Sequence, residues 1–287
     1  MIALALHGGA GAKAGRDYTT EIEHMAEVAA EARATLRVGA HALDVVTDVV
    51  AALEASGLYV AGKGASPNAA GHYELDAALM TGHDQQCGAV AALMDYPSPV
   101  RVARAVMERT PHVLLAGDGA GLFAAEQGFA AISDPDNYFT RAGRFESNHP
   151  PGTLAHGTVG CVCLDAHGRL AAATSTAGVF GKLPGRVGDT PLIGAGTWAD
   201  AHAAVSCTGQ GEYFIRVNAA AQVAFRHATG EALDAASDAV LARIAGMGGE
   251  GGLIAVNAKG EVCVPFRSQG MKRAWFSDDG EIVSEAF

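Results

Sequence analysis

Apolar residues recur along the chain at two spacings, one typical of helices and one typical of strands. Apolar positions three or four residues apart predict amphipathic helices. These helices cover residues 19–38, 41–55, 98–109, 117–127, 212–227 and 233–244. Short runs rich in β-branched and other apolar residues predict strands. The strands cover residues 2–6, 74–80, 87–93, 112–116, 158–164, 170–176, 203–208, 253–257 and 261–266.

Both spacings stop at about residues 133–157, where Pro, Asn, Asp, Gly and isolated charges replace the apolar periodicity. We expect a polar linker there, although a structureless stretch of about 25 residues is unusual inside a compact domain. Strands and paired helices occur on each side of this linker. The pattern therefore predicts two half-domains that complete one layered core.

Composition and charge narrow the class of protein. Hydrophobic residues make up 49% of the 287 residues and charged residues 18%, which is typical of a globular protein. The net charge is −11 and Lys and Arg do not cluster, which excludes nucleic acid and anionic membranes as partners. The five scattered cysteines predict reduced thiols in a cytoplasmic protein, with Cys161 and Cys163 as a core pair. We expect no signal peptide and no membrane span.

Polar residues beside glycines mark the strand ends after the linker. They occur in H-G-T-V-G (156–160), T-S-T (174–176), G-R-V-G-D (185–189) and C-T-G-Q-G-E (207–212). A threonine hydroxyl is a weak nucleophile that needs a base, and no Ser-His-Asp arrangement is evident. If the peptide bond before Thr158 is cut, the freed α-amine, with a pKa of about 8, supplies that base on the same residue. This pattern predicts a catalytic site.

A glycine-rich turn at residues 7–11 follows the first strand and leaves two interpretations open. It is either close backbone packing at the sheet end or a turn pressed against the catalytic centre. A third interpretation, a phosphate-binding enzyme that uses this turn, is disfavoured because the turn lacks the Lys-Ser/Thr of a P-loop.

Five ordered motifs resemble the plant-type asparaginase/isoaspartyl peptidase family of N-terminal nucleophile hydrolases. They are H-G-T-V-G, T-S-T, G-R-V-G-D-T-P-L-I-G-A-G, S-C-T-G-Q-G-E and P-F-R-S-Q-G-M. The resemblance implies an α+β fold, a four-layer αββα sandwich. It also implies autocleavage between Gly157 and Thr158, which gives an α-subunit (1–157) and a β-subunit (158–287) that form one domain.

The resemblance also implies roles for individual residues. Thr158 is the nucleophile, and the Thr176 hydroxyl hydrogen-bonds to it. Arg186 and Asp189 hold the α-carboxylate and the α-ammonium of an aspartyl group, which fits a guanidinium and a carboxylate.

The remaining implied positions are Thr208 and the Gly209 amide as the oxyanion hole, and Gly211 as a substrate-contacting backbone position. The implied reaction cleaves β-aspartyl dipeptides to L-aspartate and an amino acid, with a side activity on L-asparagine. L-asparaginase as the main activity is the alternative. No catalytic cofactor is expected, and the implied assembly is a homodimer of αβ units.

The match has departures. The family's Phe-Asn-Ala-Gly-x-Gly reads Y-V-A-G-K-G here, so Val60 replaces an asparagine, and Thr190 stands where serine is usual. In the family this loop holds a sodium ion through main-chain carbonyls. The matching positions are Leu53, Glu54, Ser56, Tyr59, Ala61 and Lys63.

Two competing interpretations involve the same fold. A glycosylasparaginase would read Asp where this chain has Gly157 and would be secreted. An uncut, non-catalytic amino-acid-binding protein would stay one band on a gel. Dividing 29.2 kDa in the ratio 157 to 130 predicts bands of about 16 and 13 kDa for a maturing enzyme.

Overall fold

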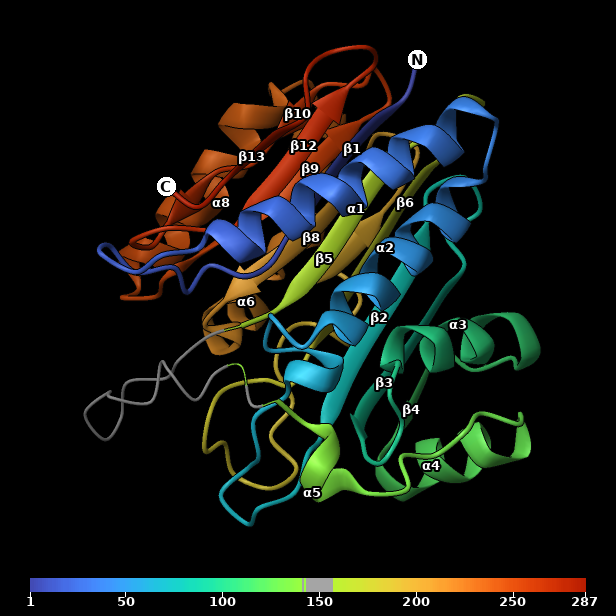
Figure 1. Ribbon diagram of the computed structural model, residues 1–287. Coiled ribbons are helices and arrows are strands. Elements are labelled where there is room, and N and C mark those ends of the chain that lie inside the picture. Colours follow the sequence, from blue (N-terminus) through green and yellow to red (C-terminus); the bar gives the residue numbers. More distant parts are fainter. Residues whose placement is uncertain (141, 143–156) are drawn as a thin grey trace.

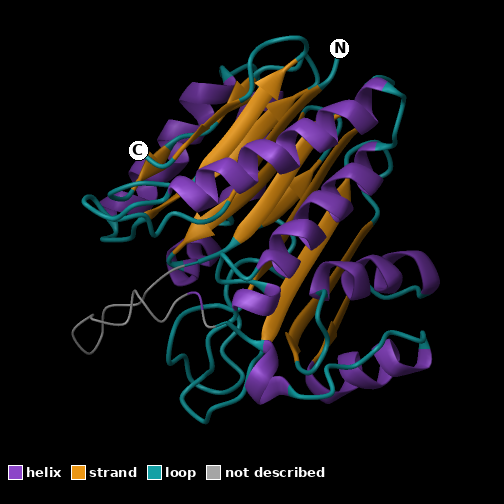
Figure 2. Cartoon of the chain, viewed as in Figure 1, coloured by secondary structure: helices purple, strands orange, loops and turns teal. Residues whose placement is uncertain are grey.

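A computed structural model describes residues 1–140, 142 and 157–287 and shows two stacked β-sheets between two layers of helices (Figures 1 and 2). This confirms the predicted α+β, four-layer αββα architecture. The helices over the first sheet are α1 (Thr19–Arg37), α2 (Ala42–Ser56), α3 (Pro99–Arg109) and α4 (Gly117–Glu126). Those over the second sheet are α6 (Gly211–Val217), α7 (Ala219–Ala228) and α8 (Leu233–Gly246). Two short helical elements are η1 (Gly62–Gly64) and α5 (Pro135–Tyr138).

The described strands form an eight-stranded sheet and a five-stranded sheet. In order across the first sheet they are β13 (Val283–Glu285), β12 (Arg273–Ser277), β1 (Ala3–His7), β5 (Val159–Leu164), β6 (Leu170–Thr176), β2 (Leu75–Thr81), β3 (Cys87–Leu93) and β4 (Leu114–Ala116). The second sheet runs β10 (Val262–Cys263), β9 (Gly251–Asn257), β8 (Ala203–Gly209) and β7 (Thr197–Ala199), with β11 (Phe266–Arg267) also on β9.

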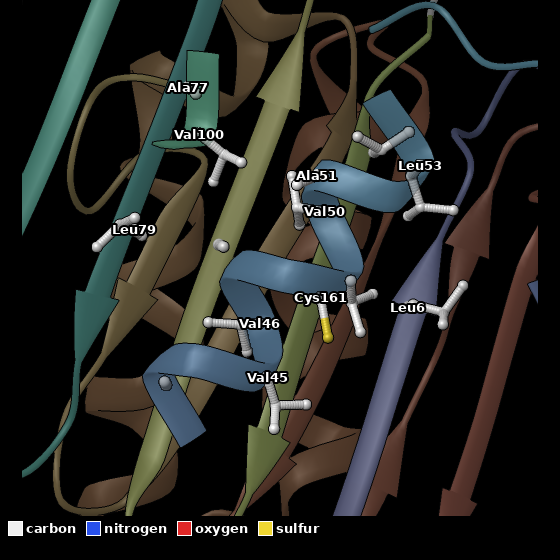
Figure 3. Packing of buried hydrophobic residues seen from close by; sticks show 14 of the residues in the cluster. Leu6, Val45, Val46, Val50, Ala51, Leu53, Ala77, Leu79, Val100 and Cys161 are labelled. Atoms are coloured by element: carbon white, nitrogen blue, oxygen red, sulfur yellow. The ribbon is translucent and has the colours of Figure 1, made fainter. Parts of the chain in front are cut away.

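The residues of strand β1 are nearly all apolar because of where the strand lies. Both faces of the first sheet are covered, so the alternating side chains of β1 enter two different cores. Leu4 and Leu6 pack under the helices, whereas Ala3 and Ala5 face the second sheet. Figure 3 shows the helical side of this core, where α2 lies over β5 and neighbouring strands. Cys161, drawn there, is buried in this core with the other cysteine of the predicted pair.

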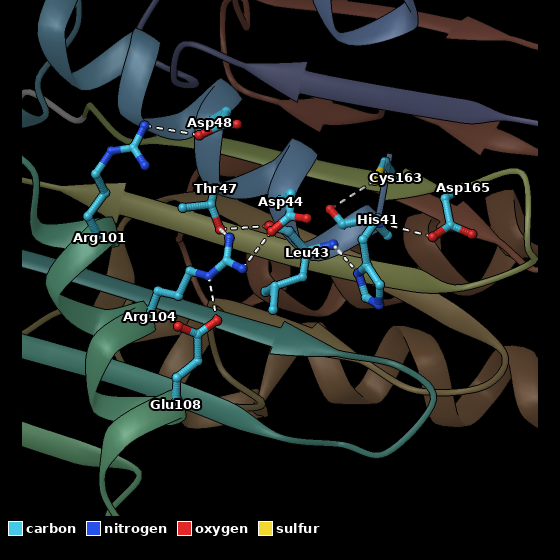
Figure 4. A network of polar contacts seen from close by, with 11 residues as sticks. His41, Leu43, Asp44, Thr47, Asp48, Arg101, Arg104, Glu108, Cys163 and Asp165 are labelled. Carbon is cyan, nitrogen blue, oxygen red and sulfur yellow. Dashed lines mark hydrogen bonds and ion pairs between the residues drawn. The ribbon is translucent and has the colours of Figure 1, made fainter. Parts of the chain in front are cut away.

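Polar contacts fix α2 on the first sheet (Figure 4). The His41 ring accepts a hydrogen bond from Leu43 N at 3.1 Å and so caps the helix. Asp165, in the turn between β5 and β6, accepts from Ala42 N at 3.0 Å. At the other side of the helix, the Arg104 guanidinium of α3 pairs with Asp44. The helix is therefore bound both to the β5–β6 turn and to α3.

Three expectations need correction. The predicted helix over residues 212–227 is two helices, because Asn218 adopts a left-handed conformation with φ 52°. This break turns the first N–H groups of α7 toward the carbonyls of Gly194 and Ala195, which accept from Ala221 N and Ala220 N. The segment predicted as a structureless linker contains α5, and the part of it at residues 141 and 143–156 lies outside the described residues. Strands β7, β12 and β13 are absent from the prediction.

No helix among the described residues combines the length and the apolar character that a bilayer crossing requires.

Candidate active site

Thr158 lies at the start of β5, where the two halves of the chain meet. Its side chain is buried, and its Oγ1 donates to the Thr176 hydroxyl at 3.3 Å. Thr176 ends β6, the neighbouring strand, and its Oγ1 donates to the Gly157 carbonyl at 2.6 Å. Because a hydroxyl has one proton, Thr176 is an acceptor toward both Thr158 and Gly178 N. Thr176 therefore contacts both sides of the Gly157–Thr158 peptide bond.

Close packing explains the glycines of the H-G-T-V-G motif. A Cβ at position 157 would overlap Val60, and one at position 160 would overlap the Ser206 hydroxyl. Gly9, in the glycine-rich turn, has φ +99°, and a Cβ there would lie 3.2 Å from Thr158 N. Of the two interpretations of residues 7–11, the turn pressed against the site is the one that the structure supports.

His7 is a site residue that the sequence analysis missed. It is fully buried at the end of β1, with Nδ1 3.2 Å from the Thr158 carbonyl and Nε2 3.0 Å from Ser206 Oγ. Contact with a carbonyl requires that Nδ1 carry the proton. Burial lowers the pKa of His7 to about 3, against the opposing effect of the Thr158 hydrogen bond, so the ring is neutral. His7 orients the nucleophile's backbone and does not serve as its base.

A chain of hydroxyls continues from His7 toward the opposite side of the pocket. Ser206 Oγ lies 2.8 Å from Thr174 Oγ1, which accepts from Thr197 Oγ1 at 2.7 Å. The Thr197 hydroxyl also lies 3.1 Å from the Thr190 carbonyl. All of these side chains are buried, so the network rigidifies the site. A signal for it existed in the sequence, as polar residues inside otherwise apolar strands.

Arg186 and Asp189 lie on the loop between β6 and β7. The Arg186 guanidinium contacts Glu212 twice, with Nε and Nη2 each 2.9 Å from Oε1. Asp189 is buried, and its Oδ2 has no hydrogen-bond partner among the described residues. Burial raises the pKa of Asp189 to about 7, although its own backbone amide and the charge of Arg186 oppose the shift. Such an oxygen is prepared for a cationic ligand.

Strand β8 brings Thr208 and Gly209 to the same end of the sheets. Thr208 Oγ1 accepts from Ala10 N at 3.1 Å, which leaves the hydroxyl proton available to a ligand. Gly209 has φ +153°, a conformation that favours glycine. Gly211 lies where a Cβ would come within 2.7 Å of Asp189 Oδ1, so its small size makes room for that carboxylate.

A small pocket unites most of the predicted site residues. Thr158, Thr176, Arg186, Asp189 and Gly209 all line it, whereas Thr208 and Gly211 do not. The other lining residues are Gly157, Gly178, Val179, Gly188 and Thr190. The predicted sodium loop is separate from the pocket, and it approaches the site through Val60 at Gly157.

The stacked sheets between helical layers, with a threonine at a strand start facing an oriented hydroxyl, define an N-terminal nucleophile hydrolase. The chain matches the family model described as Asparaginase over residues 1–149 and 139–283, and it belongs to that family.

Curated relatives match along nearly the whole chain. It is 45% identical to an isoaspartyl peptidase of Salmonella typhimurium, over 95% of this chain and 94% of that protein. It is 41% identical to an isoaspartyl peptidase of Escherichia coli, over 95% and 92% of the two chains. An isoaspartyl peptidase/L-asparaginase of Homo sapiens is 37% identical, over 96% and 93%.

Proposed function

We propose that this protein cleaves its own chain between Gly157 and Thr158 and then hydrolyses β-aspartyl dipeptides to L-aspartate and an amino acid. The observation that carries the proposal is the position of Thr176, whose hydroxyl donates to the Gly157 carbonyl while it accepts from Thr158. A hydrogen bond to that carbonyl stabilises the oxygen on which charge develops when Thr158 Oγ1 attacks. The products would be the subunits 1–157 and 158–287.

Cleavage would change what each group can do. The new α-amine of Thr158 takes the proton from its own hydroxyl as the base. Once the Gly157 carbonyl leaves, the single proton of Thr176 is free to point at Thr158 Oγ1 and to orient the nucleophile. Thr158 then attacks the side-chain carbonyl of the aspartyl group, and Thr208 with the Gly209 amide would stabilise the oxyanion. The leaving amine departs with the proton that the Thr158 α-amine took up, and water then hydrolyses the threonine ester and releases L-aspartate.

Charge at the far side of the pocket supports selection of an aspartyl group with free α-groups. The unpartnered Asp189 Oδ2 suits an α-ammonium, and the guanidinium of Arg186 suits an α-carboxylate. A normal α-peptide lacks that free carboxylate and would be refused. L-asparagine carries both groups, so L-asparaginase activity is the expected side reaction.

One substitution tests the proposal. Thr158→Ala removes the nucleophile and should leave a single band of 29.2 kDa with no aspartate released from β-Asp-Leu. The unaltered protein should show bands of about 16 and 13 kDa, as the division of that mass predicts. Thr35→Ala, at an exposed position of α1, is the matched control and should mature normally. Aspartate release by Thr158→Ala would refute the mechanism, and an uncut, inactive natural protein would favour the binding-protein interpretation.

The balance between the two activities needs its own comparison. Measuring kcat/KM on β-Asp-Leu, β-Asp-Arg, β-Asp-Lys and L-asparagine in one preparation ranks the leaving groups. We expect the dipeptides to be preferred. A preference of about tenfold for L-asparagine, or about 1.4 kcal/mol, would make asparaginase the main activity.

We also propose a structural sodium ion at the loop after α2. The residues fit, because a Cβ at Gly62 would come 2.6 Å from the Glu54 carbonyl oxygen and one at Gly64 would overlap that of Tyr59. Glycine thus leaves a cradle of main-chain oxygens, which a hard cation prefers. The carbonyls that would hold the ion are those of Leu53, Glu54, Ser56, Tyr59, Ala61 and Lys63. The ion would brace the loop that carries Val60, and a higher melting temperature in NaCl than in choline chloride would support it.

Finally, we propose that two αβ units form a homodimer, supported by the family alone. Light scattering should then give about 58 kDa, twice 29.2 kDa.

The five cysteines are free in the structure, which supports a reducing compartment such as the cytoplasm.

A further inference from the structure

Two carboxylates and one ammonium are buried next to the substrate pocket, and the proposed reaction uses none of them. Glu74 and Asp76 lie at the start of β2, and Lys182 lies on the loop from β6 to β7. Asp76 is paired in register with Thr176 on the neighbouring strand. Side chains of directly opposed residues share one face of a sheet, so this charge cluster adjoins the catalytic threonines.

Lys182 contacts Glu74 directly, and its charge also lowers the pKa of Asp76. Its Nζ donates to the Glu74 carbonyl at 3.0 Å and lies 3.8 Å from Glu74 Oε2. Asp76 Oδ1 accepts from Ala92 N at 2.7 Å, but Asp76 Oδ2 is buried without a hydrogen-bond partner among the described residues. Burial raises the pKa of Asp76, and the charge of Lys182 is the largest opposing influence. A buried carboxylate is costly without such a counter-charge.

Arg186 is the other cation that acts on Asp76, since its charge also lowers the pKa of that carboxyl. Gly178 makes room for both cations. A Cβ there would lie 3.3 Å from Lys182 Nζ and 3.3 Å from Arg186 Nη1. If Lys182 lost its charge, Asp76 would keep an unpartnered oxygen and would attract the guanidinium of Arg186, which the substrate α-carboxylate needs.

Resting on the proposed function, we infer that Lys182 is a positioning residue for substrate recognition. It compensates Glu74 and Asp76, so that the Arg186 guanidinium, which also contacts Glu212, is not drawn to Asp76 and stays available to the α-carboxylate of the aspartyl group. Glu74 adds to this by accepting from Gly185 N at 2.8 Å, directly before Arg186 in the chain. Lys182 is not among the residues that line the pocket.

The test is a charge-rescue cycle on β-Asp-Leu. Lys182→Met keeps the apolar stem and should raise KM about tenfold while kcat stays within about threefold, because binding rather than chemistry is affected. Adding Asp76→Asn removes the unbalanced charge and should return KM to within about threefold of the natural enzyme. A loss of packing alone would not be repaired by the second substitution. Gel bands and melting temperature establish that each variant matures and folds.

An unchanged KM in Lys182→Met, or a double variant as impaired as the single one, overturns the inference. A natural protein that releases no aspartate overturns the proposed function and the inference together, whereas an active natural protein isolates the inference. If Lys182→Met does not fold, the KM of the Asp76→Asn single variant tests the inference instead. Lys182 then still has Glu74, so KM should stay within about threefold, and a tenfold rise contradicts the inference.

Discussion

At the residue scale, Gly157 has no room for a larger side chain, because a Cβ there would overlap Val60. Gly157→Ala should therefore displace the scissile carbonyl from the Thr176 hydroxyl. Overpacking of this kind costs about 1–3 kcal/mol, and a barrier raised by that much slows maturation by roughly fivefold to 150-fold. Densitometry of the uncut band after expression measures that rate.

Two further variants separate steric overlap from other effects of the alanine. Gly119→Ala in α4 meets no atom within 4 Å, so it should mature at the natural rate. Val60→Gly added to Gly157→Ala removes the overlapping atoms and should restore part of the rate. Normal maturation of Gly157→Ala would contradict this prediction, because it would show that Val60 can move aside without raising the barrier to cleavage.

The proposed role of Asp189 in holding the α-ammonium predicts that ligand binding depends on pH. Its pKa is raised to about 7 by burial, so in the free protein the neutral form is favoured below that pH. This group favours folding most at pH values below its ordinary pKa of about 3.9, and it favours folding less as the pH rises toward 7. An α-ammonium needs the carboxylate, and below pH 7 the affinity for L-aspartate should fall by up to about tenfold per pH unit.

Calorimetry of L-aspartate binding between pH 5.5 and 8 tests this coupling. At pH 6 the measured enthalpy should differ between buffers of different ionisation enthalpy, because Asp189 releases a proton on binding. At pH 8 that contribution of Asp189 should disappear. An affinity that is flat from pH 5.5 to 7 contradicts the raised pKa.

At the scale of elements, the β5–β6 turn holds α2 through one carboxylate. Asp165 accepts from Ala42 N, His167 N, Arg169 N and Arg169 Nε, at 2.6 to 3.0 Å. Burial disfavours its charge, but these hydrogen bonds outweigh burial and lower its pKa. Asp165→Ala leaves several donors without an acceptor, and we expect a loss of about 2–4 kcal/mol in the free energy of unfolding.

Urea unfolding of the uncut Thr158→Ala background measures that loss without the complication of two chains. Asp48→Ala is the control on the same helix, since its pair with Arg101 is exposed and should contribute less than about 1 kcal/mol. Because the pKa of Asp165 is lowered, its contribution is present above its ordinary pKa of about 3.9 and is lost as the pH falls below it. Equal losses for the two variants would contradict the role of the turn.

Elements with strong periodicity were predictable from the sequence, whereas those that depend on distant partners were not. α2 and β3 follow from local apolar spacing, and the structure places them within a residue or two of the prediction. The break at Asn218 depends on carbonyls of the Gly194–Ala195 turn, which no local pattern reveals. β12 is a strand because it pairs with β1, and the paired residues His7 and Arg273 lie 266 positions apart in the sequence.

The site residues also differ in whether the sequence alone could identify them. Thr158, Arg186 and Asp189 could be identified because motifs carry them, and the structure brings them to one pocket. His7 could not, because its role depends on the pairing of β1 with β5, which sets it opposite Gly160. Lys182 could not be identified either, since its ion-pair partner Glu74 directly precedes β2, far away in the sequence.

At the scale of the whole molecule, the proposed cut would divide the eight-stranded sheet, in which strands of the two subunits are interleaved. β1 from the first subunit lies between β12 and β5 of the second, and β2 pairs with β6. The core between the sheets also draws on both sides of the cut, since Ala5 and Met80 pack in it with Val162 and Ile254. The first fragment therefore has no complete sheet of its own, and the second keeps only the five-stranded sheet intact.

We expect the two fragments to remain one folding unit after maturation. They should co-elute in gel filtration at the volume of the uncut Thr158→Ala protein, and they should separate only in denaturant. Thermal unfolding should show one transition, because strands shared across a sheet lose their partners together. Fragments that elute apart without denaturant, or two separate transitions in the melting curve, would mean that each subunit folds alone, which the interleaved strand order argues against.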